Sequence, residues 1–212
     1  MSPPAAPPFR PWRTVDAVHL AAFSLGLMAM TTALHAVVLP LKVLQVAPEE
    51  LKNTYLGLVA FAGLLVAAAT QPAAGRLSDR ATTPWGRRRP FIVVGTALAA
   101  LFLVALGYAG SYLALFAIAL ALQLGSNVAQ GPYQALLRDL VPALRRGEAA
   151  GVKVLADILG GVAVVAVLAV AAGAENGGAG VLALAIGVPV AVLLGTMAWT
   201  VLAVPEEPYG PQ

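Results

Sequence analysis

The chain has 212 residues, of which 59% are hydrophobic and 11% are charged. Soluble domains carry about 25% charged residues, so this composition excludes an ordinary soluble protein and indicates a chain surrounded by lipid. The sequence contains no cysteine, which excludes disulfides, thiolate nucleophiles and cysteine-ligated metal sites. A net charge of +3 would favour nucleic-acid binding only if the basic residues formed one soluble patch, and their distribution indicates another role.

Six apolar segments are long enough to cross a bilayer, whose hydrocarbon core of about 30 Å requires roughly 20 helical residues. In chain order they cover residues 15–41, 51–73, 91–109, 112–133, 152–173 and 181–204. We therefore predict an all-α membrane protein in which residues 15–204 form one domain of six transmembrane helices. Residues 1–14, which include five prolines, are predicted to be a disordered tail, and residues 205–212 a second short tail.

Lysine and arginine gather on one side of the predicted membrane domain. Eleven of them lie in the first tail, in the connections after the second and fourth helices, and at the start of the fifth helix; only Lys42 and Lys52 lie on the other side. Basic loops resist translocation and stay in the cytoplasm. We therefore predict a multi-pass protein of the plasma membrane with both termini cytoplasmic, and nucleic acid is not an expected partner.

Polar side chains inside the spans are concentrated on the first and fourth helices. Their spacing of three and four residues places each set on one helix face. The fourth helix carries Gln123, Ser126, Asn127, Gln130 and Gln134, and the first carries Ser24, Thr31, Thr32 and His35. We expect these two helices to line a polar cavity, or alternatively to use these side chains only as contacts between helices. The third and sixth helices are expected to face lipid, and their scattered Thr96, Thr196 and Thr200 are able to bond their own backbone.

Asp157 is the one carboxylate well inside a span, where a charge is costly unless it has a partner. Lys153, four residues earlier, can pair with it along the helix. Asp157 is therefore either an ion-pair partner or a residue that couples transport to protons. His35 is a second candidate for coupling, because a histidine side chain can exchange a proton near neutral pH, although a neutral hydrogen-bonded histidine fits equally well.

Two motifs follow the second and fourth helices. The first joins Gly75-Arg76-Leu77-Ser78-Asp79-Arg80 to Gly86-Arg87-Arg88-Arg89-Pro90-Phe91-Ile92. It resembles the signature loop of the major facilitator superfamily, and its long spacer looks like that of the sucrose–proton symporters and their glycoside–pentoside–hexuronide relatives. The second motif runs from Gln130-Gly131-Pro132 to Asp139-Leu140-Val141-Pro142 and on to Arg146-Gly147, and it is similar to a segment of the same group. Where those symporters carry an aspartate seven residues before this segment, the chain has Gln123, which cannot ionise.

The resemblance implies the N-terminal six-helix half of a twelve-helix fold, in which the first and fourth helices of each half line the substrate path. It also implies that Gly75 and Asp79 contact a helix of the second half and stabilise the outward-open state. The arginines of the loop would form ion pairs on the cytoplasmic side, with Asp139 as one acceptor.

We therefore predict a secondary active transporter, or half of one, that moves a small polar solute such as a sugar or glycoside by alternating access. The candidate path residues are Thr31, His35, Gln123, Asn127 and Gln130; the candidate gate residues are Gly75, Asp79, Arg80, Arg87, Arg88, Asp139 and Arg146; and the candidate coupling residues are Asp157 and His35. The expected partners are the lipid bilayer, the solute, protons and a second six-helix half, which would be a copy of the chain or a separate chain.

The sequence is also compatible with two other functional interpretations. A non-transporting assembly protein, similar to the light-harvesting-complex assembly factors that share the Ser-Asp-Arg and Arg-Arg-Arg-Pro loop, is the main alternative, and an inactive relic is a third. The sequence lacks the phosphate-binding loop, the nucleophile elbow and the His-Glu-x-x-His motif, so we expect no enzyme activity, no cofactor and no catalytic metal.

Overall fold

A computed structural model describes residues 13–173 and 177–204 of the chain. Within these residues it contains six helices that are long and apolar enough to cross a membrane, and no strand, which confirms the predicted all-α class and the number of spans. The helical elements are α1 (Thr14–Ala33), a π-helical segment (Leu34–Val38), α2 (Leu39–Val46), α3 (Lys52–Asp79), α4 (Arg89–Gly107), α5 (Tyr112–Leu140), α6 (Arg146–Gly173) and α7 (Gly177–Ala203), with short 3-10 turns at Glu49–Leu51 and Ala143–Arg145. The predicted tails, apart from residues 13 and 14 at the start of α1, lie outside the described residues.

Several helices extend beyond the predicted spans. We expected the second helix to end at residue 73 and the fourth at 133, but α3 continues to Asp79 and α5 to Leu140. The predicted fifth span begins at residue 152, whereas α6 begins at Arg146. Hydropathy marks where a helix leaves the hydrocarbon core, while its backbone hydrogen bonds can continue into water. The motif residues Gly75, Asp79 and Asp139 therefore lie in helical turns rather than in loops.

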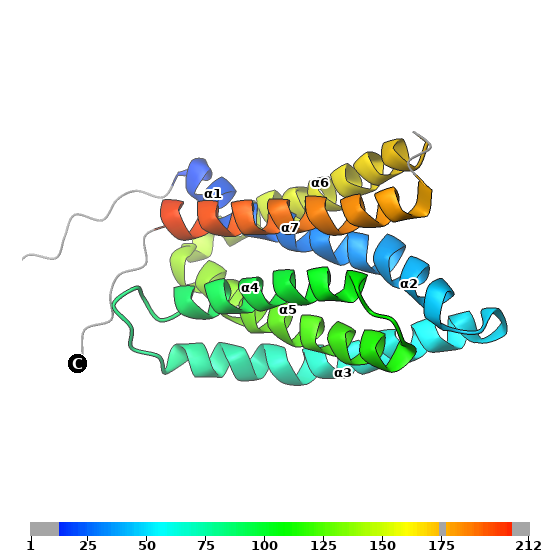
Figure 1. The fold of residues 1–212 in the computed structure, drawn as a ribbon. Coiled ribbons are helices and arrows are strands. Elements are labelled where there is room, and N and C mark those ends of the chain that lie inside the picture. The colour runs from blue at the N-terminus through cyan, green and yellow to red at the C-terminus, as the bar shows by residue number, and fades with distance from the viewer. Residues whose placement is uncertain (1–12, 174–176, 205–212) are drawn as a thin grey trace, which may run out of the picture.

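The helices form two groups of three, seen one above the other in Figure 1. In one group α1 packs against α6 and α7, and in the other α5 packs against α3 and α4. The contact between α4 and α7 joins the two groups along one side. Glycines allow the close approaches: a Cβ atom added to Gly160 of α6 would lie 2.2 Å from the carbonyl oxygen of Leu25 in α1. Small residues at helix interfaces are typical of membrane bundles, where packing replaces the hydrophobic effect.

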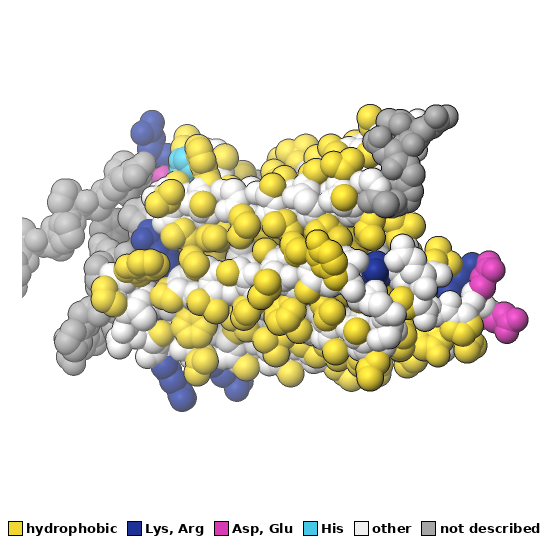
Figure 2. All heavy atoms as spheres, in the orientation of Figure 1, with side chains coloured by type: hydrophobic (Ala, Val, Ile, Leu, Met, Phe, Trp, Pro, Cys, Tyr) yellow, Lys and Arg dark blue, Asp and Glu magenta, His cyan; other side chains and the backbone are white. Residues whose placement is uncertain are grey.

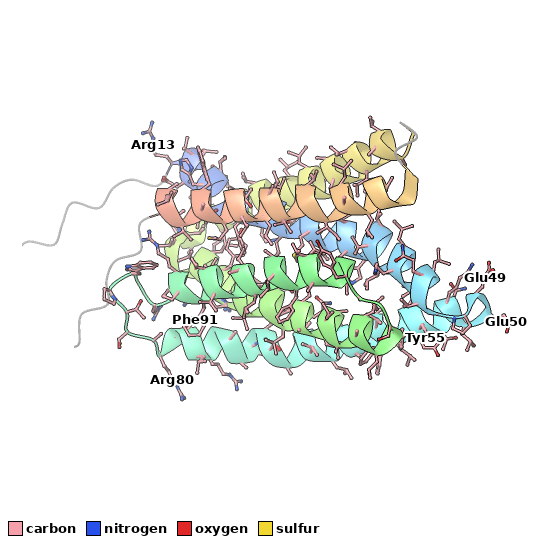
Figure 3. All side chains as sticks on the ribbon, viewed as in Figure 1. Arg13, Glu49, Glu50, Tyr55, Arg80 and Phe91 are labelled. Carbon is pink, nitrogen blue, oxygen red and sulfur yellow. The ribbon has the colours of Figure 1, made fainter. Side chains whose placement is uncertain are left out.

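The surface has a broad apolar zone between two charged ends (Figure 2). Arg13 and Arg80 lie at one end, which we call the basic end, and Glu49 and Glu50 lie at the opposite end (Figure 3). Large apolar side chains on α3 and α6, among them Phe61 and Leu155, are more than half exposed. Such a surface is stable in lipid rather than in water, so the chain is a multi-pass membrane protein.

Lys42 was expected in a solvated connection, but the structure places it in α2 with only 5% of the residue exposed. Its Nζ atom donates a hydrogen bond of 3.0 Å to the carbonyl oxygen of Gly107, the last residue of α4. A positive charge is favourable at a helix C-terminus, where the carbonyl groups have no partner within the helix. Lys42 therefore fastens the first span to α4 at the end opposite the arginines.

Thr200 connects α7 to α1 through hydrogen bonds of its side chain. Its hydroxyl donates to the carbonyl oxygen of His19 at 3.0 Å and accepts the backbone N–H of Phe23 at 3.1 Å. Thr196 bonds the backbone of its own helix, whereas Thr200 bonds the backbone of α1, because this close partner helix offers two backbone groups. The hydroxyl of Thr96 has no hydrogen-bond partner among the described residues.

Replacing Thr200 by valine is expected to lower the free energy of unfolding by about 1–3 kcal/mol, because both hydrogen bonds from its hydroxyl to the backbone of α1 are lost inside the bundle. Replacement by serine keeps the hydroxyl and should stay close to the parent protein. Thermal unfolding of the purified chain in detergent, followed by tryptophan fluorescence, measures the difference. Equal melting temperatures for the valine and serine variants would contradict this role of the two hydrogen bonds.

Candidate functional site

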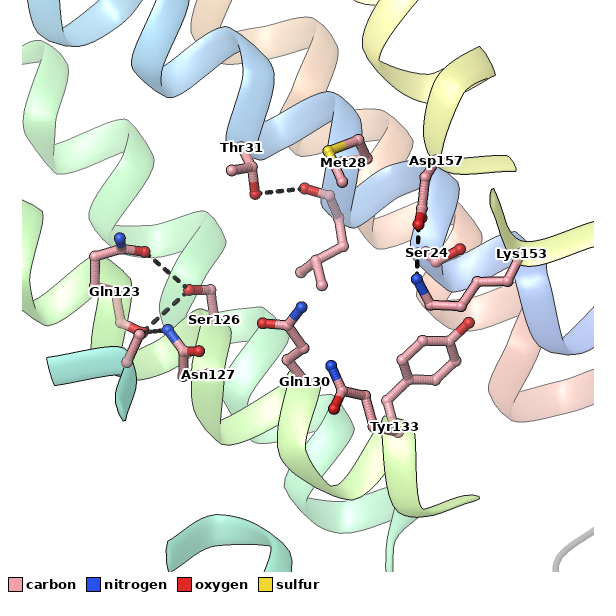
Figure 4. Close-up of a pocket in the computed structure, with 13 residues that line it drawn as sticks. Ser24, Met28, Thr31, Gln123, Ser126, Asn127, Gln130, Tyr133, Lys153 and Asp157 are labelled. Carbon is pink, nitrogen blue, oxygen red and sulfur yellow. Dashed lines mark hydrogen bonds and ion pairs between the residues drawn. The ribbon is translucent and has the colours of Figure 1, made fainter. Parts of the chain in front are cut away.

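A cavity of about 210 Å³ lies between α1, α3, α5 and α6. Figure 4 shows polar side chains from α1, α5 and α6 pointing toward it. Its polar lining consists of Ser24, Thr31, Gln123, Ser126, Asn127, Gln130, Tyr133, Gln134, Lys153 and Asp157. None of the described side chains of α4 and α7 is part of the lining. The face of α5 on which the amides recur at helical spacing is therefore the face that borders the cavity.

Much of the hydrogen bonding around the cavity stays within single helices. Asn127 Nδ2 donates to the carbonyl oxygen of Gln123 at 2.7 Å, and Ser126 Oγ donates to the same oxygen at 3.1 Å. Thr31 Oγ1 donates to the carbonyl oxygen of Leu27 at 2.8 Å. These bonds satisfy the polar atoms in an apolar bundle without holding two helices together. The hydroxyl of Tyr133, in contrast, bonds a neighbouring helix.

Tyr133 is a contact between helices, and sequence reasoning missed it. Its hydroxyl, on α5, donates to the carbonyl oxygen of Leu20 on α1 at 2.8 Å, and its ring packs edge-on against Phe23. The side chain is buried at the edge of the cavity. Its position three residues after Gln130, on the polar face of α5, is the signal that could have identified it.

The amides of Gln130 and Gln134 line the cavity and have no hydrogen bond with another group in the described part of the chain. A primary amide offers two donor hydrogens and an acceptor oxygen. These two side chains are therefore able to bond a ligand without first losing a contact within the protein. Gln134 was recognised as part of the polar face but was not among the predicted path residues.

Lys153 and Asp157 form an ion pair at the edge of the cavity, one turn apart on α6. Nζ of Lys153 lies 2.7 Å from Oδ2 of Asp157, and the two side chains are 29% and 18% exposed. The pair makes the otherwise costly carboxylate tolerable in this position. It also places one positive and one negative charge where a solute in the cavity can reach them.

His35 does not line the cavity. It lies in the π-helical segment, is exposed, and has Nδ1 2.9 Å from the carbonyl oxygen of Thr31. The widened turn is explained by Pro40, which has no N–H to donate and whose ring clashes with a regular helix. The N–H of Leu39 donates to the carbonyl oxygen of Leu34, five residues back, which is the π-helical pattern. The extra residue in the turn shifts the register of the polar face beyond Thr31.

The residues of the signature motif meet at the basic end. Arg88, whose side chain is 4% exposed, has Nη2 3.0 Å from Asp79 Oδ1 and 2.6 Å from Asp139 Oδ2, and Arg87 Nη2 also lies 2.7 Å from Asp139 Oδ2. We call Asp79, Arg87, Arg88 and Asp139 the ion-pair cluster. It joins the end of α3, the start of α4 and the end of α5. Arg80 is exposed and takes no part in it.

The connection from α3 to α4 turns at Gly86, whose φ of 96° is favourable for glycine alone. Thr83 Oγ1 donates to the carbonyl oxygen of Gly86 and closes this turn. The turn brings Arg87 and Arg88 back toward α5. The glycine of the Gly-Arg-Arg motif therefore has a local conformational role that orients the arginines.

Gly75 and Gly131 lie at the crossing of α3 and α5. A Cβ atom added to Gly131 would lie 2.4 Å from the carbonyl oxygen of Gln71 and 3.2 Å from the backbone nitrogen of Gly75. A Cβ atom added to Gly75 would meet nothing within 4 Å. The crossing therefore depends on Gly131, which was not among the predicted site residues, while the open side of Gly75 faces away from the rest of the described chain.

A second hollow, of about 410 Å³, lies between the last turns of α5 and the first turns of α6. We call it the basic hollow. Arg138, Arg146 and Lys153 line it together with Gln134 and the apolar residues Leu137, Val141, Ala149 and Ala150. Arg146 was predicted as a gate residue, and Arg138 was not. Gln134 and Lys153 border both hollows, so the two are neighbours along α5 and α6.

Comparison with known proteins identifies the family. Residues 20–210 match the family described as MFS/sugar transport protein. Sucrose transport protein SUC4 of Arabidopsis thaliana is 36% identical over 86 residues, covering 33% of this chain and 17% of the relative. Sucrose transport protein SUT2 of Oryza sativa subsp. indica is 32% identical over 109 residues, covering 42% of this chain and 22% of the relative.

The match to these relatives thus spans about a fifth of their length. The family and the relatives are described as transport proteins and not as enzymes. The family match covers nearly all of the six helices, and the motifs that suggested the resemblance lie at the ends of α3 and α5 within it. The chain therefore belongs to the MFS/sugar transport protein family of the major facilitator superfamily.

Proposed function

We propose that the chain is a secondary transporter, or half of one, that moves a small polar solute such as a sugar or glycoside by alternating access. The observation that carries the proposal is the cavity lined by the amides of α5 in an otherwise apolar bundle. Amide groups donate and accept hydrogen bonds without carrying charge, so they suit the hydroxyl groups of a neutral sugar. The family and the names of its relatives support the same solute class.

We further propose that residues 15–204 act as one half-transporter domain whose basic end faces the cytoplasm of a plasma membrane. The excess of arginine at that end supports this orientation. The cavity and the exposed faces of α3 and α6 would be covered by a second six-helix body, either a copy of the chain or a separate partner. Protons are the proposed coupling ion, and Asp157, held by Lys153, is the candidate carrier.

Flux of labelled sucrose into vesicles reconstituted with the full chain, with and without a proton gradient, tests this function. Replacing Gln130 by alanine is expected to raise the half-saturating concentration about tenfold, because one hydrogen bond of about 1.4 kcal/mol to the solute is lost. Asn127→Ala should weaken binding in the same direction.

Asn53→Ala provides the matched control, because it removes an exposed amide at the end opposite the arginines, far from the cavity. Equal kinetics for Gln130→Ala and Asn53→Ala would remove the amides of α5 from the substrate path. An absence of flux together with stable co-purification of membrane pigment proteins would instead favour an assembly protein.

A further inference from the structure

The basic hollow collects three cations, Arg138, Arg146 and Lys153, of which only Lys153 has a carboxylate partner, Asp157. No carboxylate of the described residues is part of its lining. Membrane topology explains why arginines lie at this end of the bundle, but not why three cations converge on one hollow. Like charges around a common space repel each other, and the repulsion is relieved when an anion occupies that space.

Other arginines at the same end have acidic partners. Arg88 and Arg87 contact the carboxylates of the ion-pair cluster, and Arg145 lies 2.8 Å from Glu148. In contrast, the structure gives Arg138 and Arg146 no ion pair within residues 13–173 and 177–204. Both side chains are exposed to whatever fills the hollow. Within the described residues, Arg87, Arg88 and Arg145 are thus paired with carboxylates, whereas Arg138 and Arg146 are not.

The walls of the hollow indicate the kind of anion. Leu137, Val141 and Ala149 supply apolar parts of its wall beside the cations. Leu144, in the connection between α5 and α6, is 99% exposed between the two arginines in sequence. An exposed leucine beside arginines at the end of a membrane helix suits the boundary between headgroups and acyl chains. A free inorganic anion would use the charges but not the apolar wall.

We propose that the basic hollow binds the phosphate-bearing headgroup of an anionic phospholipid. The planar guanidinium groups of Arg138 and Arg146 would each present paired N–H donors to phosphate oxygens, and Lys153 would add a point charge. The first acyl carbons would lie along Leu137 and Val141. A basic pocket between membrane helices at the cytoplasmic leaflet is a suitable place for such a headgroup.

Lys153 connects this site to the solute cavity. Its ammonium pairs with Asp157 and also borders the hollow, so a bound phosphate and Asp157 compete for one cation. Lipid in the hollow would therefore weaken the hold of Lys153 on Asp157 and change the charge at the edge of the cavity. This regulatory consequence rests on the proposed transport function, whereas lipid binding itself does not.

The test measures binding in the purified full chain in a neutral detergent. Dioctanoyl phosphatidylglycerol, dioctanoyl phosphatidylcholine and inorganic phosphate are titrated separately, and the rise in melting temperature and native mass spectra report the bound species. We expect saturable binding of the phosphatidylglycerol alone. The double variant Arg138→Gln/Arg146→Gln should bind it about 25-fold more weakly, with about fivefold contributed by each arginine.

The matched control is Arg76→Gln/Arg80→Gln, which removes the same charge from exposed positions in the last turns of α3 and directly after it, at the same end. Both double variants are first compared with the parent protein without lipid, so that a folding defect is recognised. Equal losses of binding in the two double variants would overturn the site, as would unchanged binding after Arg138→Gln/Arg146→Gln. Binding of inorganic phosphate that equals that of the lipid would overturn the lipid assignment and identify a site for free phosphate.

Because the readout is binding and not flux, a negative result here leaves the transport proposal standing. Conversely, lipid binding with no sucrose flux would retain the site and reject sucrose as the solute of the proposed transporter. Lipid binding that disappears when a second six-helix body assembles with the chain would also overturn the proposal, and would assign Arg138 and Arg146 to carboxylates of that body.

Discussion

Replacing Gly131 by alanine is expected to lower the melting temperature of the chain by roughly 2–12 °C, which corresponds to about 1–3 kcal/mol for an overpacked interface. The added Cβ atom would lie 2.4 Å from the carbonyl oxygen of Gln71, which is a backbone atom and cannot rotate away. The crossing of α3 and α5 must therefore open. Because Gln130 precedes Gly131 on α5, the same shift should move the amide that borders the cavity.

Gly75→Ala is the control on the other helix of the crossing. Its Cβ atom would meet nothing within 4 Å, and alanine favours a helix over glycine by up to about 1 kcal/mol. The melting temperature should therefore stay equal or rise. A fall in the melting temperature for Gly75→Ala as large as that for Gly131→Ala would show that the close crossing of α3 and α5 does not cause the loss of stability. If Gly75 faces a second six-helix body, Gly75→Ala should reduce sucrose flux while the stability of the chain is retained.

The six spans could be predicted because the requirement of a bilayer is simple: about 20 apolar residues in a row. The helix ends could not, since polar residues such as Asp79 and Asp139 end the apolar pattern while the backbone hydrogen bonds continue. The polar face of α5 was readable from its spacing, because three- and four-residue steps fix which side chains share a face. The cavity beside it depends on how α1 and α6 pack, and the spacing carries no information on that.

Contacts between helices were the weakest part of the sequence prediction. Thr200 could bond its own helix or a neighbouring one. It bonds the backbone of His19 and Phe23 because α7 packs closely on α1, which the sequence does not reveal. His35 was placed on the polar face by its spacing, but the wider turn before Pro40 changes the register there. Lys42 marked the end of an apolar segment, yet in the fold it is buried against the end of α4.

The ion-pair cluster and the crossing at Gly131 act on the same three helices. The cluster fastens the ends of α3 and α5 to the start of α4, and the crossing fixes α3 on α5 a few turns further into the bundle. The walls of the cavity that come from α3 and α5 are therefore positioned from the basic end. This arrangement explains how motifs at one end of the bundle can influence the shape of the cavity inside it.

Removing both carboxylates of the cluster, by Asp79→Asn/Asp139→Asn, is expected to lower the free energy of unfolding by about 3–5 kcal/mol. The reason is an asymmetry in burial: the side chain of Arg88 is 4% exposed, whereas those of Asp79 and Asp139 are 51% and 40% exposed. A buried guanidinium that loses its carboxylates retains its desolvation cost, while exposed carboxylates that lose an arginine are hydrated by water.

The asymmetry predicts a rescue. Adding Arg88→Met to Asp79→Asn/Asp139→Asn removes the buried charge and should recover a large part of the lost stability. Adding Arg80→Met, which replaces the exposed arginine directly after α3, should recover none. Melting temperatures of the parent, double and triple variants in the same detergent measure both effects. A triple variant with Arg88→Met that is less stable than the double variant would mean that Arg88 stabilises the bundle through its packing and not through the two carboxylates. The ion pairs would then result from the packing of α3, α4 and α5 and would not determine that packing.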